Sequence, residues 1–201
     1  HNLLIGTAGY GAYRLDMTTG KVTRLSRKSA NSVDNFFAIL FFDDEGYLWQ
    51  ANHTKVLRKY KYDGKSIRLV SVYEPKDLFG IRKLYATDKK GFFVAHTGGI
   101  MRYDYASHSF SRYDFDFSAH QGAGYISAVT LDKYGNLWLG TSGDGTFKIP
   151  HGSRKAYRVQ LNNLSFIFDN AHISDLLIDR DGNQWYGCYM KGLFLSNNDK
   201  N

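Results

Sequence analysis

The chain has 201 residues, of which 43% are hydrophobic, 16% aromatic and 22% charged. This composition is that of a globular protein rather than a disordered one, no apolar run is long enough to span a membrane, and a single cysteine excludes an internal disulfide or a cysteine zinc site. The formal charge of +7 favours an acidic partner. Because no run of five or more Lys or Arg occurs, we expect a solvated basic surface and no nucleic-acid partner.

A repeat runs along the whole chain. Each copy has an apolar run, an Asp-x-x-Gly turn and a second apolar run. The turn glycines lie 45, 44 and 47 residues apart, at Gly46, Gly91, Gly135 and Gly182. Residues 2–7 (Asn-Leu-Leu-Ile-Gly-Thr) match Asn136–Thr141, so a fifth copy, truncated at its front, opens the chain. The approximate units are 1–35, 36–80, 81–124, 125–171 and 172–201. A fixed period of this length indicates a repeat architecture.

The fourth copy shows how one unit is read as four short strands. The expected strands are 125–131, 136–141, 146–149 and 157–161. Asp132 opens the first turn by accepting backbone hydrogen bonds, and Gly135 supplies the positive φ that ends it. Few segments have the spacing of an amphipathic helix, so we expect almost no helix.

Four short strands in a period near 45 residues are typical of a β-propeller blade. We therefore predict an all-β chain that forms one partial β-propeller domain, a fragment of about four to five four-stranded blades over residues 1–201. Trp49, Trp138 and Trp185 recur three residues after the turn glycine, and we expect them to fill the space between blades rather than to stack on sugars. Small residues also recur at one position where adjacent sheets should approach closely: Gly6, Ala51, Gly140 and Gly187.

The order of strands predicts an open arc. The chain starts at the second strand of one blade and ends after the third strand of another, at Leu195. These terminal blades share two strand types, so they do not complement each other in a single blade. We expect either an arc of a larger propeller or association with a second copy, because exposed faces and strand edges promote association.

Residues Ile126–Ile149 resemble the two-component regulator propeller repeat, through the pattern Asp-x-x-Gly-Asn-Leu-Trp followed by Gly-Thr and a glycine-containing turn. His172–Leu195 is similar, with Gln184 and Cys188 in place of the expected Leu and Thr. The Gly46 copy departs further and the Gly91 copy lacks the Trp. The resemblance implies the periplasmic or extracellular sensing region of a hybrid two-component histidine kinase, of the kind with which Bacteroides-type bacteria detect products of polysaccharide breakdown.

The sequence predicts no catalytic site, no metal site and no cofactor. Asp179–Asn183 only superficially matches a calcium loop, because its glycine is fourth rather than sixth and the twelfth residue is Met190. Cys188 stands where other copies have Thr and is expected to be a buried small residue. The seven histidines show no chelating spacing. We therefore expect a region that is not an enzyme.

A ligand, if bound, is expected on one end of the blades. If the first strand lines the axis, the loops between second and third strands share a face with the connections between blades. The candidates from the loops are Tyr10, His53, Lys55, His96, Asp144, Tyr189 and Lys191. The connections add Asn31, Asp34, Lys76, Asp77, His120, Gln121, Asp169, Asn170 and His172. Such residues suit an oligosaccharide, with Lys and His favouring an acidic one. Asp175 on an axial strand should face channel water or a ligand.

Two other functions stay open. The chain could be an interaction or dimerisation scaffold that binds no ligand, with the basic surface and the incomplete blades in its favour. It could also be a propeller lyase, which would need a convergent acid/base or metal cluster. In the leading interpretation this region lies on the periplasmic or extracellular side of a bacterial inner-membrane protein and does not itself enter the membrane.

Overall fold

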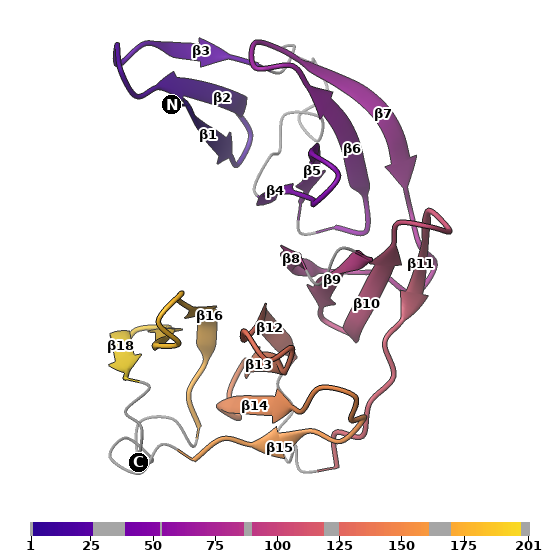
Figure 1. The fold of residues 1–201 in the computed structure, drawn as a ribbon, viewed down its shortest axis with the longest axis vertical. Helices are drawn as coiled ribbons and strands as arrows, with labels where there is room; N and C mark the ends of the chain where they lie inside the picture. The colour runs from indigo at the N-terminus through magenta and orange to yellow at the C-terminus, as the bar shows by residue number, and fades with distance from the viewer. Residues whose placement is uncertain are drawn as a thin grey trace.

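The computed structural model describes residues 2–25, 39–52, 54–86, 90–118, 125–160 and 170–197. These residues form five antiparallel sheets and no helix. The sheets follow one another around an axis, as Figure 1 shows, and every sheet keeps its strands in chain order. The prediction of an all-β propeller fragment is therefore confirmed.

The middle three sheets have four strands each and the two terminal sheets have three. The first sheet contains β1 (Asn2–Thr7), β2 (Gly11–Asp16) and β3 (Val22–Arg24). The second contains β4 (Ile39–Phe42), β5 (Tyr47–Ala51), β6 (Leu57–Tyr62) and β7 (Ile67–Tyr73). The third contains β8 (Ile81–Ala86), β9 (Gly91–His96), β10 (Gly99–Asp104) and β11 (Ser109–Arg112). The fourth contains β12 (Ile126–Leu131), β13 (Leu137–Thr141), β14 (Thr146–Ile149) and β15 (Tyr157–Arg158). The fifth contains β16 (Ile173–Ile178), β17 (Gln184–Cys188) and β18 (Gly192–Ser196).

The innermost strands β4, β8, β12 and β16 contact one another in sequence around the axis. The second strand of a blade also packs on the first strand of the next, β9 on β12 and β13 on β16. Because β1 packs on β4, it takes the place of a second strand, as its match with Asn136–Thr141 predicts. Among the described residues the first blade thus has no inner strand and the fifth no outer one.

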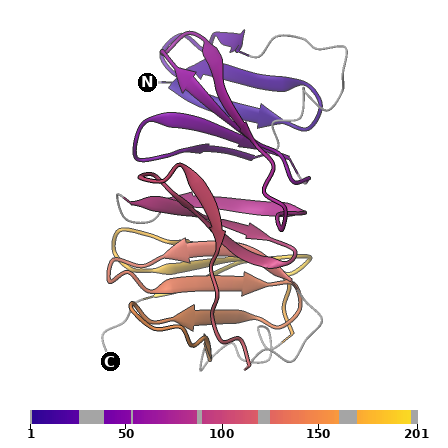
Figure 2. The same cartoon turned by 90° about the vertical axis from the view of Figure 1, so that its right-hand side faces the viewer.

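The arc formed by the described residues is open. Its extensive strand contacts join blades that are neighbours in the chain, and none joins the first blade to the fifth. Figure 1 shows these two blades at the ends of the arc, and Figure 2 shows the sheets edge-on along it. Apolar side chains are exposed at both ends, with Leu3 of β1 50% and Leu193 of β18 67% exposed.

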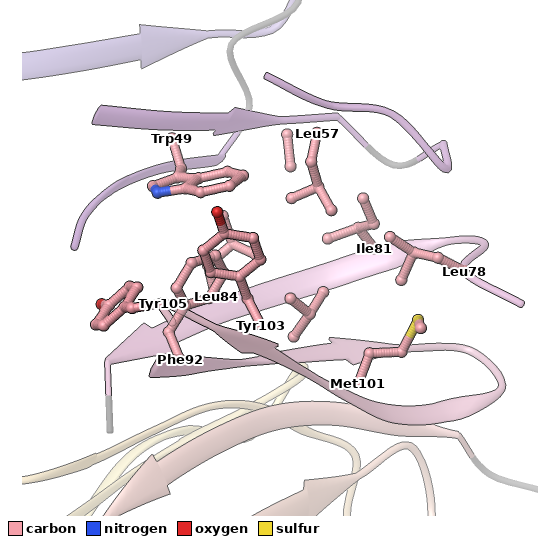
Figure 3. Packing of buried hydrophobic residues seen from close by; sticks show 11 residues of the cluster. Trp49, Leu57, Leu78, Ile81, Leu84, Phe92, Met101, Tyr103 and Tyr105 are labelled. Carbon is pink, nitrogen blue, oxygen red and sulfur yellow. The ribbon is translucent and has the colours of Figure 1, made fainter. Parts of the chain in front are cut away.

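The hydrophobic core is divided into four clusters, each lying between two neighbouring blades. Figure 3 shows the cluster between the second and third blades, where the fully buried Trp49 lies among side chains from both sheets. Its ring centroid is 4.8 Å from that of Tyr103 and 4.9 Å from that of Phe92. Trp138 is likewise buried, in the cluster between the fourth and fifth blades. Both therefore fill space between blades, as predicted, whereas Trp185 on the last described blade is half-buried.

The Asp-x-x-Gly turns are held by the side chain of their aspartate. One carboxylate oxygen accepts the backbone N–H four residues on, and the other accepts the indole N–H of the tryptophan six residues on. The indole bonds measure 2.7 Å for Asp43–Trp49 and 3.0 Å for both Asp132–Trp138 and Asp179–Trp185. The carboxylate thereby satisfies a donor that packing between blades would otherwise bury without a partner.

These hydrogen bonds favour the ionised carboxylate. The bonds from Trp185 and Asn183 lower the pKa of Asp179. Burial opposes ionisation of Asp132, but the bonds from Trp138 and Asn136 outweigh it and lower its pKa. Both turns should therefore lose stability only when the pH falls below the ordinary range for aspartate.

The close approach predicted at the recurring small residues is present at Gly140. A Cβ there would lie 2.7 Å from Cγ2 of Ile173 on the next blade and 3.2 Å from Cβ of Ala128. At Gly187, in the last described blade, the nearest atom would be Oγ of Ser174 at 3.3 Å, within the same sheet. The constraint at Gly140 thus comes from the neighbouring blade.

We predict that Asp132→Asn lowers the free energy of unfolding by about 1.5–3 kcal/mol at pH 7, the usual contribution of hydrogen bonds to a charged group. Urea unfolding measures the change. The folded-state pKa of Asp132 is lowered, so the contribution is present above about pH 4 and is lost as the pH falls through the folded-state value. The difference in unfolding free energy between Asp132→Asn and the wild type should therefore become smaller at acidic pH. Asp181→Asn, at an exposed turn residue, removes the same charge and should change little.

Gly140→Ala should cost about 1–3 kcal/mol, because the added methyl group must displace the buried side chain of Ile173. Thermal unfolding of this variant is compared with that of Gly187→Ala, which adds the same atom at the matching position of the last described blade. A clearly smaller loss is expected for the second variant. Equal losses would show that the neighbouring blade is not the cause.

Candidate functional site

The two ends of the blades carry different kinds of connection. The loop face bears the turns between second and third strands, such as 142–145 and 189–191, and the connections between blades. The turn face, at the opposite end of the strands, bears the Asp-x-x-Gly turns and the turns between third and fourth strands, such as 150–156. The described ligand residues that the sequence predicts all belong to the loop face, except Asp175.

Two of these residues are buried: Asp144 contacts a strand of its own blade, and His96 contacts the segment that leads into its own blade. The Asp144 carboxylate forms an ion pair with Arg158, whose guanidinium also donates to the Asp144 carbonyl at 3.1 Å. His96 is 4% exposed, its ring packs against Phe79 with 5.6 Å between centroids, and its Nδ1 accepts the Gly98 N–H at 3.1 Å. Burial lowers the pKa of His96. These contacts give both residues a structural role at the loop face.

The remaining described candidates are accessible on the loop face, with His172 half-buried and the others exposed. Tyr189 is 63% exposed and stacks on His172, with 5.4 Å between ring centroids and 34° between their planes. Lys191 is exposed two residues further on. Tyr10, on the first blade, is 73% exposed. Lys55 forms an exposed ion pair with Glu74 at 3.4 Å. An accessible aromatic surface beside a cation is therefore present on the fifth blade.

Several candidates lie outside the described residues: His53, His120, Asn31, Asp34, Gln121 and Asp169. Lys76, Asp77 and Asn170, from the connections between blades, are described and exposed.

Asp175 lies on the axial strand β16, with its side chain 60% exposed, and forms an ion pair with Lys83 of β8. The pair joins the third blade to the fifth across the inner strand of the fourth. In both strands the register shifts just before the charged residue, because Arg82 and Ser174 are extra residues in their ladders. Such bulges redirect side chains, and here they accompany two opposite charges that meet near the axis.

The structure also brings together residues that sequence reasoning missed. A cavity of about 250 Å³ opens on the loop face between the third and fourth blades, with Gly98, Arg112, Tyr113 and Tyr125 among its lining residues. Beside it, the guanidinium of Arg82 lies 4.4 Å from the ring centroid of Tyr125. No motif marks these residues, because their proximity depends on how one blade packs on the next.

The described residues offer little for covalent or metal chemistry. No three His, Cys, Asp or Glu side chains within that part of the chain are grouped so that they could hold a metal ion. Cys188 is buried, and burial raises the pKa of its thiol, so it is a packing residue, as predicted. None of the described segments forms a helix that is long and apolar enough to cross a membrane.

An arc of four-stranded antiparallel blades with short Asp-x-x-Gly turns defines the class of the protein as a β-propeller. Residues 121–143 match the family model described as two component regulator propeller. This confirms the resemblance seen in the repeat around Trp138. No curated protein matches the chain.

Solved structures share this fold. One is PorZ of Porphyromonas gingivalis, a surface component of the type-IX secretion system (19% identity, TM-score 0.71, 98% of this chain and 31% of that one). Another is the extracellular domain of BT3049 from B. thetaiotaomicron, described as a hybrid two component system (19% identity, TM-score 0.67, 98% of this chain and 25% of that one). A third is the extracellular domain of BT4673 from B. thetaiotaomicron, described as a one component system (17% identity, TM-score 0.68, 97% of this chain and 26% of that one). The chain spans between a quarter and a third of their lengths, and identities this low show the fold alone.

Arg158→Gln should lower the free energy of unfolding by roughly 3 kcal/mol, because it removes the cation beside the buried Asp144 carboxylate. Urea unfolding tests this, with Arg112→Gln as the matched control. Arg112 pairs with Asp114 at 2.9 Å, but both side chains are more than two-thirds exposed, so its loss should cost at most about 1 kcal/mol. Equal effects would contradict a structural role for Asp144.

Proposed function

We propose that this propeller is the sensing region of a two-component signalling protein, located on the periplasmic or extracellular side of the inner membrane, and that it is not an enzyme. The match of residues 121–143 to the two-component regulator propeller family supports this class of protein. The likeness in fold to extracellular domains of signalling systems is consistent with it. Because one fold serves many functions, the kind of ligand must be inferred from the surface residues of this chain.

We further propose that the loop face recognises an oligosaccharide. The observation that carries this is the exposed stack of Tyr189 on His172, with Lys191 nearby. An exposed aromatic ring can pack on the apolar face of a sugar while neighbouring polar groups bind its hydroxyls. The adjacent lysine would favour a sugar that bears an acidic group.

A second candidate function is that of an interaction or dimerisation scaffold. It is favoured by the exposed leucines of the fifth blade, Leu177, Leu193 and Leu195, which are 53%, 67% and 43% exposed. Apolar surface of this kind commonly marks a contact with another protein. Further blades or a second copy of this chain would be the partner, and the ligand would bind elsewhere.

Calorimetric titration of the protein with a panel of neutral and acidic oligosaccharides tests the leading proposal. Tyr189→Ala should weaken binding of the active oligosaccharide by about tenfold or more, since stacking on an aromatic ring contributes roughly 1–3 kcal/mol. Tyr157→Ala removes an equally accessible ring, 51% exposed on the outer strand β15, and should leave binding unchanged. Unaltered binding in both variants would contradict a site at Tyr189, and the absence of binding by every oligosaccharide in the panel would favour the scaffold.

A further inference from the structure

A second cavity, larger than the one on the loop face, lies on the turn face. It has a volume of about 680 Å³, within the usual range for small-molecule sites. It lies between the third and fourth blades, where residues 131–135 and 150–154 of the fourth blade meet the end of β11. None of the sequence-predicted loop-face candidates lines this cavity, so substitutions of those candidates should not alter ligand binding in it.

The interior of this turn-face cavity is apolar and aromatic. Phe93, Leu137 and Ile149 line it and belong to the buried core between the two blades. Tyr85 and Tyr113 pack against the same core and remain half-buried, so part of each ring faces the cavity. These surfaces suit the apolar face of a ring-shaped ligand.

The polar residues around the cavity are predominantly basic. Four carry a positive charge: Arg102, Arg112, Lys133 and Arg154. Among the described lining residues, the single acidic one is Asp132, whose carboxylate accepts hydrogen bonds from Trp138 and Asn136 in its own turn.

Two of these cations are balanced by nearby carboxylates. Arg102 lies 3.5 Å from Asp104, and Arg112 lies 2.9 Å from Asp114. The ion pairs formed within the described segments involve neither Lys133 nor Arg154. Lys133 and Arg154 thus supply two positive charges against the one negative charge of Asp132, which leaves the described lining with an excess of positive charge.

Arg154 is held in position rather than extended into solvent. Its Nη1 donates to the backbone carbonyl of Asp114 at 2.6 Å, and its guanidinium carbon lies 5.3 Å from the ring centroid of Tyr113. His151 is also held by the turn, because its backbone N–H donates to Oδ1 of Asn136 at 2.9 Å. A cation is thus fixed beside an aromatic ring, which reduces the entropy lost when a ligand binds.

We propose that the turn-face cavity binds a saccharide that bears an anionic group. The sugar ring packs against Tyr113 and Tyr85, and the anionic group accepts charge-assisted hydrogen bonds from Arg154 and Lys133. A carboxylate, as in a uronic acid, and a phosphate ester share this chemistry. The site shares Arg112 and Tyr113 with the smaller cavity on the loop face, but it contains none of the residues proposed to bind an oligosaccharide there.

Amide chemical shifts of the ¹⁵N-labelled protein test the proposal, during titration with D-glucuronate, glucose 6-phosphate, glucose and inorganic phosphate. At least one acidic sugar should shift the amides of Lys133, Gly135 and Gly152 while leaving Gly143 and Lys191 unchanged. Whichever acidic sugar binds identifies the anionic group. Glucose and inorganic phosphate should each bind at least about tenfold more weakly than the acidic sugar, because glucose lacks the anionic group and phosphate lacks the sugar ring. Equal binding of inorganic phosphate, or shifts confined to the loop face, would overturn the proposal.

Variants distinguish direct binding of the anionic group by Arg154 and Lys133 from a general effect of the positive surface charge. Arg154→Gln combined with Lys133→Gln should weaken the acidic sugar at least tenfold, and Arg154→Lys should retain most of the affinity. Lys155→Gln is the control, because Lys155 is an exposed cation in the same turn that does not line the cavity. Unchanged shifts of the loop-face amides report that each variant is folded. An equal loss in the control would also overturn the proposal. Failure of Tyr189→Ala to alter oligosaccharide binding would refute the loop-face site and leave this one standing.

Discussion

The architecture depends on the hydrogen bond that the indole N–H of a tryptophan donates to the carboxylate of the turn aspartate six residues earlier, because this bond satisfies two opposing requirements of a blade. A sheet of three or four short strands cannot bury its faces alone, so large side chains must fill the space between neighbouring sheets. Tryptophan supplies the volume but carries a donor that is costly to bury unpaired. The carboxylate that closes the turn accepts this donor in the second, fourth and fifth blades, at 2.7–3.0 Å. Turn geometry and packing between blades are thus coupled through one side chain.

The same dependence on neighbours explains the two ends of the arc. Trp49 and Trp138 are buried because a further blade covers them, whereas Trp185 and the leucines of β18 are covered by no described blade. In the first blade only Ala12 and Leu25 are buried in the cluster shared with the second. The apolar ends are therefore the part of the molecule whose stability depends most on a partner, while the interior interfaces are complete.

Polar residues near the two faces divide into those used by the fold and those left for recognition. Asp144 and His96 are buried and engaged in contacts of their own blades, although their positions in the repeat made them ligand candidates. Tyr189, His172 and Lys191 remain accessible on the loop face, and Arg154 and Lys133 remain so at the turn-face cavity. The solved structures with this fold include both signalling domains and a secretion-system component, so these accessible residues, rather than the propeller itself, distinguish its function.

The sequence alone determined the all-β fold, the blade repeat, the role of Trp49 and Trp138, and the close approach at Gly140. These features depend on local periodicity and on turn chemistry, which a linear pattern contains. Only the tertiary structure decided that Asp175 meets Lys83 near the axis and that Arg158 neutralises Asp144. It alone also revealed a basic cavity where the third and fourth blades meet. The axial pair depends on the bulges, and the cavity depends on the angle at which one sheet packs on the next. Arg158 reaches Asp144 within one sheet, through the pairing of β14 with β15. None of these three features produces a periodic pattern in the sequence.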